Sequence, residues 1–433
     1  MRIKISNGLV IDPANNIEAK HDIYISEGRI AAIGKQPDGF TLDQTIDASG
    51  CHVIPGIVDL RARLREPGQE NKGTIASETR TAAASGITTL CIPPDTTPVI
   101  DTTSVIELIH QRTDEAGYAK VVTLAALTAG LKGEQLSEMA ILKKYGNCVG
   151  VSNALMPVTN NLVMRRAMEY AASCGLTIFL HAEDEGLAGN GCAHEGAIST
   201  RLGLPGIPET AETNAIARDL LLIEQTGVHA HFCHISSARA VQMIARAQYD
   251  GLPVTADVSA HHLHLTEMDI GFFDSNCHIR PPLRTQRDRE ALVDALATGN
   301  LNAICSDHEP HDADAKLAPF AETEAGISAL ETLLPLALRL TEELSLSDVI
   351  DRLTNQPAKI LGIDAGTLSL GEKADICIYN PETNWIMKTE NMMSAGRNTP
   401  FEGWEFKGKV THTLLNGKVV FTNSEKPDSG VKN

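Results

Sequence analysis

Polar side chains that could carry out chemistry follow short apolar runs along the middle of the chain. Three arginines alternate at Arg61, Arg63 and Arg65, just after Asp59. Later apolar runs end in Asp95, Ser152-Asn153, His181, His234, and Ser306-Asp307-His308 with His311. Neutral imidazoles and carboxylates are the usual ligands of a catalytic zinc ion, whereas guanidinium groups bind anions and have no lone pair for a metal. The sequence therefore offers part of a metal-ligand set beside a set of cations.

Repeated strand–helix units would bring these residues together. Short apolar runs, at 56–60, 88–92, 121–124, 177–180, 229–232, 254–257 and 303–305, alternate with amphipathic helical stretches. This repetition is typical of a parallel α/β sheet, and the number of units favours a (β/α)8 TIM barrel over residues 55–362. Because active sites of such barrels lie at the C-terminal ends of the strands, we expect the polar residues to share the barrel mouth.

The two ends of the chain have a different pattern. Residues 1–54 read as short strands separated by turns such as Asn7-Gly8, and the same pattern returns after residue 362, with Asn416-Gly417 as one of its turns. We therefore expect a small β-sandwich domain built from residues 1–54 and 363–433. The sequence has no glycine-rich phosphate-binding loop of the GxGxxG or GxxxxGK[ST] type, which weakens dinucleotide and nucleoside-triphosphate functions.

Composition excludes several classes of protein. The chain has 433 residues and a formal net charge of −18, which argues against a nucleic-acid or anionic-membrane binder. No stretch approaches the roughly 18 apolar residues of a membrane span, and the N-terminus lacks the apolar core of a signal peptide. Nine scattered cysteines without a CxxC pair indicate free thiols in a reducing compartment. These features predict a cytoplasmic protein with neither nucleic-acid nor membrane partners.

Residues 55–90 read PGIVDLRARLREPGQENKGTIASETRTAAASGITTL, and this segment resembles the dihydroorotase pattern PGxxDxHxHxREPG of the amidohydrolase superfamily. Further similar segments follow in order: IPPDTTPVIDT, LHAEDE, HFCHISSARA, VSAHHLHLTE, RPPLR, CSDHEPH, NQPAKILGI and NTPFEGWEFKGKV. The resemblance implies a metallo-dependent-hydrolase-type barrel. It also implies the interconversion of dihydroorotate and carbamoyl aspartate by a water molecule that zinc activates.

Several ligand positions of that family are changed here. The family's HxH pair corresponds to Arg61 and Arg63, and its bridging aspartate corresponds to Asn153. The remaining ligand matches are His181, His234 and Asp307, of which Asp307 also matches the family's catalytic aspartate. We therefore expect a degenerate metal site that holds no cofactor.

Substrate contacts implied by the resemblance are also altered. The carboxylate-binding arginine of the family is retained as Arg65, and His311 closes an intact HxPH signature that begins at His308. Two asparagines of the family correspond to Asp95 and Arg280. Replacing neutral donors by an anion and a cation changes the charge of the predicted substrate site.

The arginines at alternating positions should all point into the barrel, and two interpretations of them stay open. One is an internal network of ion pairs with the carboxylates Asp59, Asp95 and Asp307. The other is an anion site that holds a small carboxylate through Arg65. Arg61 and Arg63 with Asp307 carry a net +1, as would two zinc ions with two carboxylates and a hydroxide. The arginines could thus replace the metals electrostatically, but they supply no nucleophile.

The leading hypothesis is a dihydroorotase-like pseudoenzyme of pyrimidine biosynthesis. Family members that have lost ligands serve as structural partners of aspartate transcarbamoylase, so the resemblance implies an oligomeric assembly with that enzyme. One alternative is an active zinc-dependent dihydroorotase, or another cyclic amidohydrolase, with a single metal held by His181 and His234. Another is an arginine-lined sensor for a small carboxylate.

Overall fold

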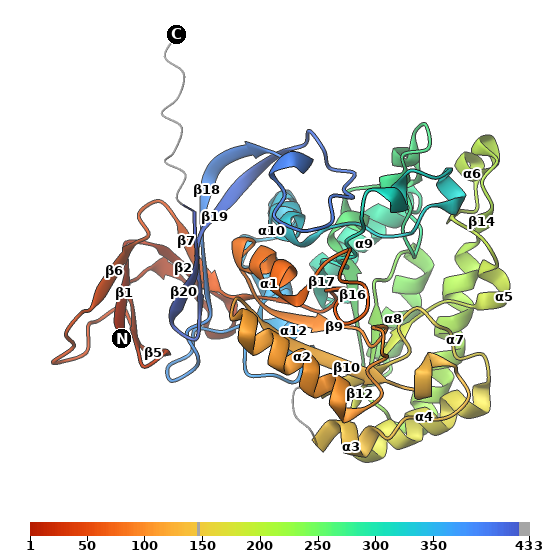
Figure 1. Cartoon of the computed structure of the whole chain (residues 1–433), viewed down its shortest axis with the longest axis horizontal. Helices are drawn as coiled ribbons and strands as arrows, with labels where there is room; N and C mark the ends of the chain where they lie inside the picture. Colours follow the sequence, from red (N-terminus) through yellow and green to blue (C-terminus); the bar gives the residue numbers. More distant parts are fainter. Residues whose placement is uncertain (145–147, 424–433) are drawn as a thin grey trace, which may run out of the picture.

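The middle of the chain forms a barrel of eight parallel strands (Figure 1), in a computed structural model that describes residues 1–144 and 148–423. The strands pair in the order β17-β16-β15-β12-β11-β10-β9-β8. Their bounds are β8 (Ile57–Asp59), β9 (Ile87–Ile92), β10 (Lys120–Ala126), β11 (Cys148–Ser152), β12 (Thr177–His181), β15 (Ala230–Cys233), β16 (Val254–Ser259) and β17 (Ala303–Cys305). A parallel bridge between Ala62 and His308 joins the ends of this order, so the barrel is nearly closed. The predicted TIM barrel is confirmed.

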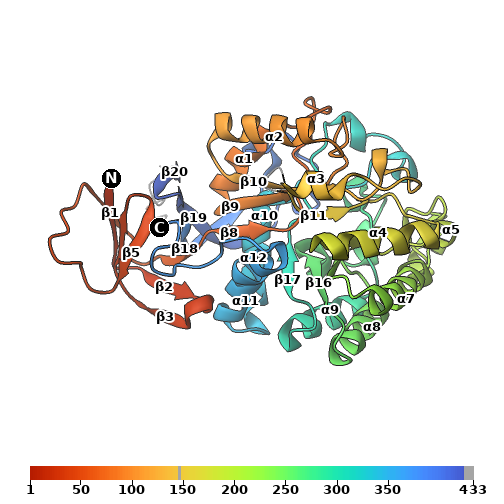
Figure 2. The ribbon, with the colours of Figure 1, turned by 90° about the horizontal axis from the view of Figure 1, so that it is seen from below.

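Helices cover the outside of the barrel (Figure 2). The longer ones are α1 (Ile75–Ala84), α2 (Thr103–Ala116), α4 (Asn161–Cys174), α7 (Glu209–Thr226), α8 (Ala238–Tyr249), α9 (Gln286–Thr298), α10 (Leu330–Leu338) and α11 (Leu346–Leu353). Apolar residues at helical spacing face the strands; α8, for example, buries Ala240, Val241, Ile244 and Ala247. Because helices cover its outer face and side chains fill its interior, β9 is buried along its whole length.

Side chains fill the barrel interior below its mouth. Val58, Leu60, Phe179 and Cys305 belong to one buried apolar cluster. The short helix α12 (Asn355–Leu361) contributes Leu361 to the same cluster. The interior is therefore a packed core, as in other TIM barrels, and chemistry is confined to the mouth.

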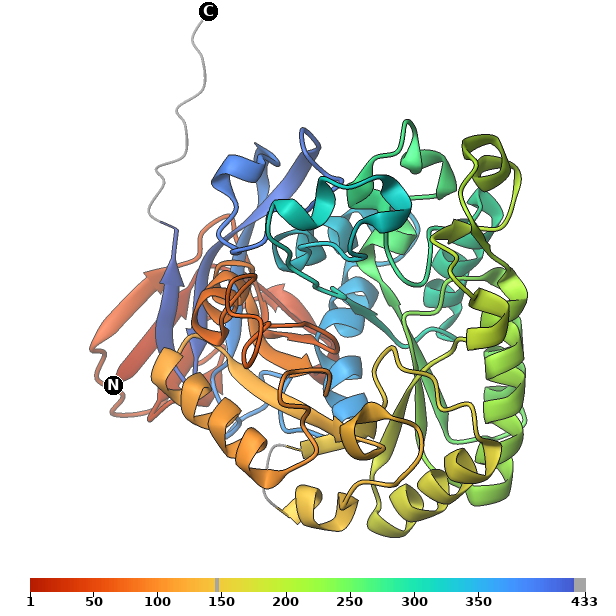
Figure 3. The same ribbon diagram turned by 45° about the vertical axis from the view of Figure 1, so that its right-hand side comes forward.

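Both ends of the chain form a second domain of two sheets beside the barrel (Figure 3). One sheet has the order β5 (Arg29–Ile33), β4 (Ile23–Ser26), β1 (Arg2–Ser6) and β6 (Gln44–Asp47). The other has the order β20 (Lys418–Thr422), β19 (Glu405–Leu415), β18 (Ile376–Ile386), β7 (His52–Pro55), β2 (Leu9–Asp12) and β3 (Ile17–Lys20). Apolar residues from both sheets, including Ile3, Ile25, Val53, Ile376 and Leu414, share one core. The predicted two-ended β domain is thus confirmed.

The connection between β18 and β19 ties this domain to the barrel mouth. The Ser394 hydroxyl donates to Glu78 Oε2 on α1 at 2.7 Å, and Asn398 Oδ1 accepts from the backbone nitrogen of His311 at 2.8 Å. His308 Nε2 lies 3.0 Å from the same Glu78 carboxylate. The predicted signature residues His308 and His311 therefore help to fix this connection.

The cysteines and the helices agree with the composition. All nine cysteines are free thiols, and Cys174 is the only one that is not buried. Across the part of the chain that the structure describes, no helix combines the length and the apolar character needed to cross a membrane.

Candidate active site at the barrel mouth

Three arginines that follow β8 form ion pairs with three carboxylates. We call these six residues the mouth network: Arg61, Arg63, Arg65, Asp95, Asp307 and Glu309. Arg61 Nε lies 2.8 Å from Asp307 Oδ1, and Arg63 Nη2 lies 2.8 Å from Asp95 Oδ2. Arg63 Nη1 also lies 3.9 Å from Asp307 and 3.3 Å from Glu309. Three positive charges are thus balanced by three negative ones, instead of the net +1 counted for Arg61, Arg63 and Asp307.

These ion pairs are buried, which increases their effect on the stability of the fold. Arg61, Arg63 and Asp307 are 5%, 6% and 7% exposed. Burial by itself raises the pKa of Asp95, but the charges of Arg63 and Arg61 outweigh this effect and lower that pKa below its usual value. Asp95 therefore stays ionised and paired. Removing one partner of such a buried pair leaves the other charge uncompensated, which is strongly destabilising.

Arg65 is also bound by protein groups. Its Nε donates to the backbone oxygen of Pro310 at 2.8 Å, and its Nη2 lies 3.5 Å from Glu309 Oε1 and 3.1 Å from His311 Nε2. Burial and the nearby charge of Arg65 lower the pKa of His311 to about 3, so its imidazole is neutral. The two residues matched to substrate binding are thus in contact with each other.

Asp59 departs from the sequence prediction. It was expected in the ion-pair network, but its carboxylate accepts hydrogen bonds from the hydroxyl and the backbone nitrogen of Ser306. Burial raises the pKa of Asp59 to about 7. No ion pair of Asp59 is found within residues 1–144 and 148–423, and Glu309 takes the place that was predicted for it. The reason is that Asp59 fixes the backbone at Ser306, beside Asp307, instead of facing the guanidinium groups.

The two retained histidines contact each other directly. His181 Nδ1 and His234 Nε2 are 2.7 Å apart, a hydrogen bond in which one ring donates and the other accepts. His234 Nδ1 lies 3.7 Å from Asp307 Oδ2. Burial and the charge of Arg61 hold the pKa of His234 well below its usual value, so this imidazole is neutral. His181 Nε2 and His234 Nδ1 have no hydrogen-bond partner among the described residues.

Arg280 is held by a carboxylate that the sequence analysis missed. Its Nε lies 2.9 Å and 3.0 Å from the two carboxylate oxygens of Glu183, and its Nη2 also donates to Oε1. His181 Nε2 lies 3.8 Å from Glu183 Oε2. Burial opposes ionisation of Glu183, but the proximity of His181 and the hydrogen-bonded Arg280 lower its pKa to about 2. Contacts therefore run without a break from Arg280 across the histidines to the mouth network.

Asn153 alone among the predicted site residues is bonded elsewhere. Its Oδ1 accepts from the Thr128 hydroxyl at 2.7 Å, and its Nδ2 donates to the backbone oxygens of Leu131 at 3.2 Å and Met156 at 2.8 Å. The amide thus uses both its donor and its acceptor capacity to hold two loops. An aspartate at this position could not make the two donated bonds.

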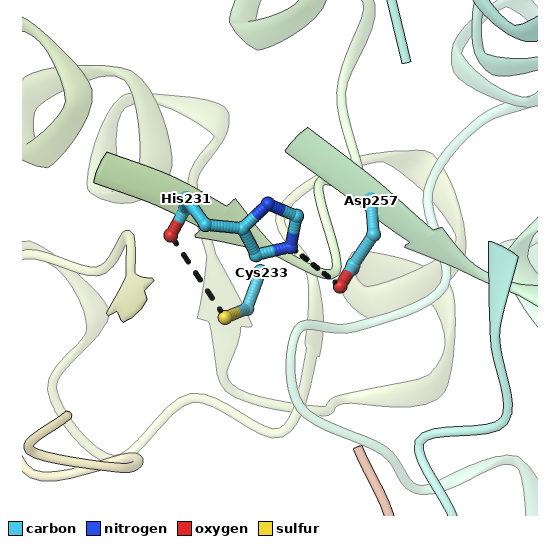
Figure 4. Close-up of side chains that lie close together, drawn as sticks. All are labelled: His231, Cys233 and Asp257. Carbon is cyan, nitrogen blue, oxygen red and sulfur yellow. Dashed lines mark hydrogen bonds and ion pairs between the residues drawn. The ribbon is translucent and has the colours of Figure 1, made fainter. Parts of the chain in front are cut away.

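Another cluster of potential metal ligands, His231, Cys233 and Asp257, lies on the adjacent strands β15 and β16 (Figure 4). One ligand atom each of His231, Cys233 and Asp257 lies within 4.8 Å of the others. However, His231 uses both ring nitrogens, one 2.9 Å from Asp257 Oδ2 and the other 2.8 Å from the Thr255 hydroxyl. Asp257 Oδ1 accepts from the backbone nitrogen of His234. This cluster positions His234, which has a left-handed φ of 40°.

The residues at the mouth do not supply a complete ligand set for a tetrahedral zinc ion. His181 Nδ1 and His234 Nε2 converge to 2.7 Å, and to bind one zinc they would have to give up their hydrogen bond and separate to about 3.3 Å. The nearest carboxylate, Asp307, is already paired with Arg61. The two nearby guanidinium groups would also repel the ion. The donor set thus lacks the third ligand and the local negative charge that zinc requires.

The cavity that Arg63 and Arg65 line is small. The cavity lined by Arg63, Arg65 and Asp95 has a volume of about 20 Å³, roughly one water molecule, whereas small-molecule sites usually have about 300–1,000 Å³. A larger cavity of about 410 Å³ is bordered by His278 and Arg280, but Glu183 occupies that guanidinium group. The geometry favours the internal ion-pair network over an anion site at Arg65.

Sequence reasoning missed two site residues, Glu183 and Glu309. Each lies two positions beyond a residue that was identified, His181 or Asp307. The chain is not extended at either place, because Glu183 N donates to the backbone oxygen of His181 and Asp307 has a left-handed φ of 46°. The alternation used for the arginines therefore does not apply to these carboxylates, and only their spacing from the identified residues pointed to them.

Comparisons with known proteins agree with this architecture. A family model described as Dihydro-orotase-like matches residues 50–240, and one described as Amidohydrolase family matches residues 328–421. A dihydroorotase-like protein of Pseudomonas putida is 49% identical over 97% of this chain and 99% of its own length. A dihydroorotase of Syntrophotalea carbinolica is 44% identical over 98% of this chain and its full length.

Solved structures support the fold. The L-hydantoinase (dihydropyrimidinase) from Arthrobacter aurescens superposes with a TM-score of 0.87 at 24% identity, covering 98% of this chain and 96% of that one. Such a likeness at low identity concerns the architecture alone. The relatives of high identity and coverage decide the family. The chain belongs to the dihydroorotase-like family of the amidohydrolase superfamily.

Proposed function

We propose that this protein is a dihydroorotase-like pseudoenzyme that binds no catalytic zinc and does not interconvert dihydroorotate and carbamoyl aspartate. The observation that carries the proposal is the buried pair between Arg61 and Asp307, 2.8 Å apart, at the position where the family has a metal ligand and its catalytic aspartate. A guanidinium group stays protonated at physiological pH, so it can neither ligate zinc nor activate water.

The other groups at the mouth do not replace the missing nucleophile. As a general base, Asp307 would need a free carboxylate beside a water molecule, but it is held by Arg61 and lies 3.9 Å from Arg63. His181 and His234 bond to each other. Substrate contacts are also changed, because Asp95 and Arg280 are bound in ion pairs within the protein.

For the biological role, we propose a structural subunit in pyrimidine biosynthesis, in a cytoplasmic assembly with aspartate transcarbamoylase. What supports this role is the contrast between a preserved fold and an altered mouth. The chain is 48% identical over 97% of its length to a dihydroorotase-like protein of Pseudomonas aeruginosa. At the barrel mouth, however, its arginines and carboxylates form ion pairs with one another. The overall fold is kept, while the positions that match the family's HxH pair and bridging aspartate hold Arg61, Arg63 and Asn153.

One experiment tests both parts. The purified chain is assayed for hydrolysis of dihydroorotate with and without added zinc, and is then sedimented with aspartate transcarbamoylase of the same organism. We expect no hydrolysis in either condition and a joint sedimenting species. Zinc-dependent hydrolysis would contradict the pseudoenzyme, and separate sedimentation of the two proteins would contradict the partnership.

An active dihydroorotase is the second candidate, and one observation favours it. Relatives named dihydroorotase are 42–44% identical over nearly the whole chain. In this case a single zinc ion would replace the proton between His181 and His234. Titration with dihydroorotate and carbamoyl aspartate separates a third case, a carboxylate sensor, because a sensor binds them without turnover.

A further inference from the structure

A pair of adjacent phenylalanines is exposed on a loop at the barrel mouth. Phe272 is fully exposed and Phe273 is 47% exposed. Met268 on the same loop is 60% exposed, and Leu317 on the next mouth loop is 78% exposed. We call these four side chains the phenylalanine patch. Single exposed apolar residues are common on proteins, but four large ones on two loops that are hydrogen-bonded to each other make a candidate binding surface.

The two loops are held together and are anchored from below. The Ser275 hydroxyl donates to the backbone oxygen of Lys316 at 2.8 Å, which joins the loop after β16 to the loop after β17. Ile270 and Cys277 of the first loop are buried. The backbone nitrogen of Thr266 bonds to the Asp269 side chain at 2.7 Å. The patch is therefore presented by an ordered scaffold, which lowers the entropy lost on binding.

The backbone holds Phe273 in an unfavourable conformation. Its φ is +67°, in the left-handed region that bulky side chains rarely adopt. Such strain persists only where the surrounding structure enforces it, and it is concentrated at functional sites. Here it accompanies an aromatic side chain that stays half exposed. Burial of the ring within this chain therefore does not explain the strained conformation.

The charges around the patch restrict what can bind there. The exposed carboxylates on the two loops are Asp269, Asp274, Asp314, Glu322 and Glu324, of which Glu324 is paired with Lys72. Across 266–278 and 312–326, the one lysine or arginine is Lys316, whose ammonium group donates to the backbone oxygens of Glu324 and His278. The surroundings of the phenylalanine patch are therefore acidic. A second copy of this chain or an anionic membrane would be repelled.

We propose that the phenylalanine patch is the docking surface for a different protein, whose apolar pocket receives Phe272 and is rimmed by lysine and arginine. This inference rests on the proposed function, in which that protein is aspartate transcarbamoylase. Aromatic anchors in the centre of an interface carry much of the binding energy, and the acidic rim would steer a basic partner toward them. The barrel mouth then keeps a role in assembly after losing its ligands for chemistry.

The test measures the affinity of the full-length chain for aspartate transcarbamoylase of the same organism. The variant F272S/F273S should bind about tenfold more weakly or worse. D314K/E322K should also bind more weakly, and wild-type affinity should fall as ionic strength rises. L221S/Y249S is the matched control, because Leu221 and Tyr249 are 68% and 83% exposed on α7 and α8, outside these two loops. Its affinity should not change.

Three results would overturn the inference. If wild type binds and F272S/F273S binds equally well, the docking surface is wrong while the proposed partnership stands. If wild type does not bind, the partnership fails and this inference fails with it. If F272S/F273S abolishes self-association or binding to phosphatidylserine vesicles, the patch serves a different occupant. Equal melting temperatures of the variants and wild type establish that the loop substitutions leave the fold intact.

Discussion

The two halves of the barrel mouth differ in how their polar groups are satisfied. On one half, after β8, β9 and β17, the mouth network pairs three arginines with three carboxylates. On the other half, after β12 and β15, His181 and His234 bond to each other, and each keeps one buried ring nitrogen without a hydrogen-bond partner among the described residues. The replaced half is balanced in formal charge, although Arg61 Nε and Nη2 and Asp307 Oδ1 likewise have no hydrogen-bond partner among the described residues. The retained half is joined instead by one hydrogen bond between two imidazole rings.

Residues that match the family's metal ligands therefore do not by themselves form a metal site. Two histidines that match ligands of the family are present, but the neighbouring arginines affect them. Arg61 pairs with Asp307 and helps to keep His234 neutral. The imidazoles then partner each other. Counting ligands along the sequence would suggest a half-preserved metal site, while the geometry indicates two different structural arrangements.

The largest expected effect comes from breaking the arginine half. Asp307→Ala leaves Arg61 buried without its partner and should lower the free energy of unfolding by about 3–5 kcal/mol. Chemical denaturation measures this change. As a control, Glu169→Ala removes the partner of Arg165 from an exposed pair on α4, where a loss of about 0.5 kcal/mol or less is expected. Equal effects at the two sites would mean that the mouth network does not stabilise the barrel.

The retained half should respond to acid through Glu183. Its pKa is lowered to about 2 from its ordinary value of 4.5, so its contribution to stability is present above pH 4.5. This contribution is lost as the pH falls toward 2, because the unfolded chain then binds the proton first. The shift corresponds to at most about 3 kcal/mol. Denaturation at several pH values should show a smaller decline between pH 4.5 and 2 in Glu183→Gln, and an unchanged decline would contradict the assignment.

The family's ligand types can be restored at the three changed positions of the mouth. We expect the triple variant R61H/R63H/N153D to regain zinc but not hydrolysis, because Asp95 and Arg280 still alter the substrate site. The Asn153→Asp component should cost about 1–3 kcal/mol, since an aspartate cannot donate to the carbonyls of Leu131 and Met156. Metal analysis and denaturation of R61H/R63H with and without Asn153→Asp measure these effects. Equal stability of the two variants would show that the bonds of Asn153 matter little.

Much of the fold could be predicted from the sequence, because alternating apolar runs and helices leave a clear pattern. The pairs of Arg63 with Asp95 and of Arg61 with Asp307 were also within reach, since opposite charges at strand ends meet at the mouth. Which polar group pairs with which at the mouth was less predictable. Asp59 bonds to Ser306 instead of an arginine, and that choice depends on backbone geometry that residue spacing does not contain. The contact between His181 and His234 likewise depends on ring orientation.

Zinc binding by the wild-type chain shows whether the barrel mouth can hold a catalytic metal. The protein is equilibrated with zinc alone, desalted, and measured for bound metal beside H181N/H234N, which accounts for ions held by cysteines elsewhere. Because the imidazoles bond to each other and Asp307 is paired with Arg61, we predict equal, substoichiometric zinc in both proteins. One zinc ion per wild-type chain that disappears in H181N/H234N would contradict the proposal that the chain binds no catalytic zinc.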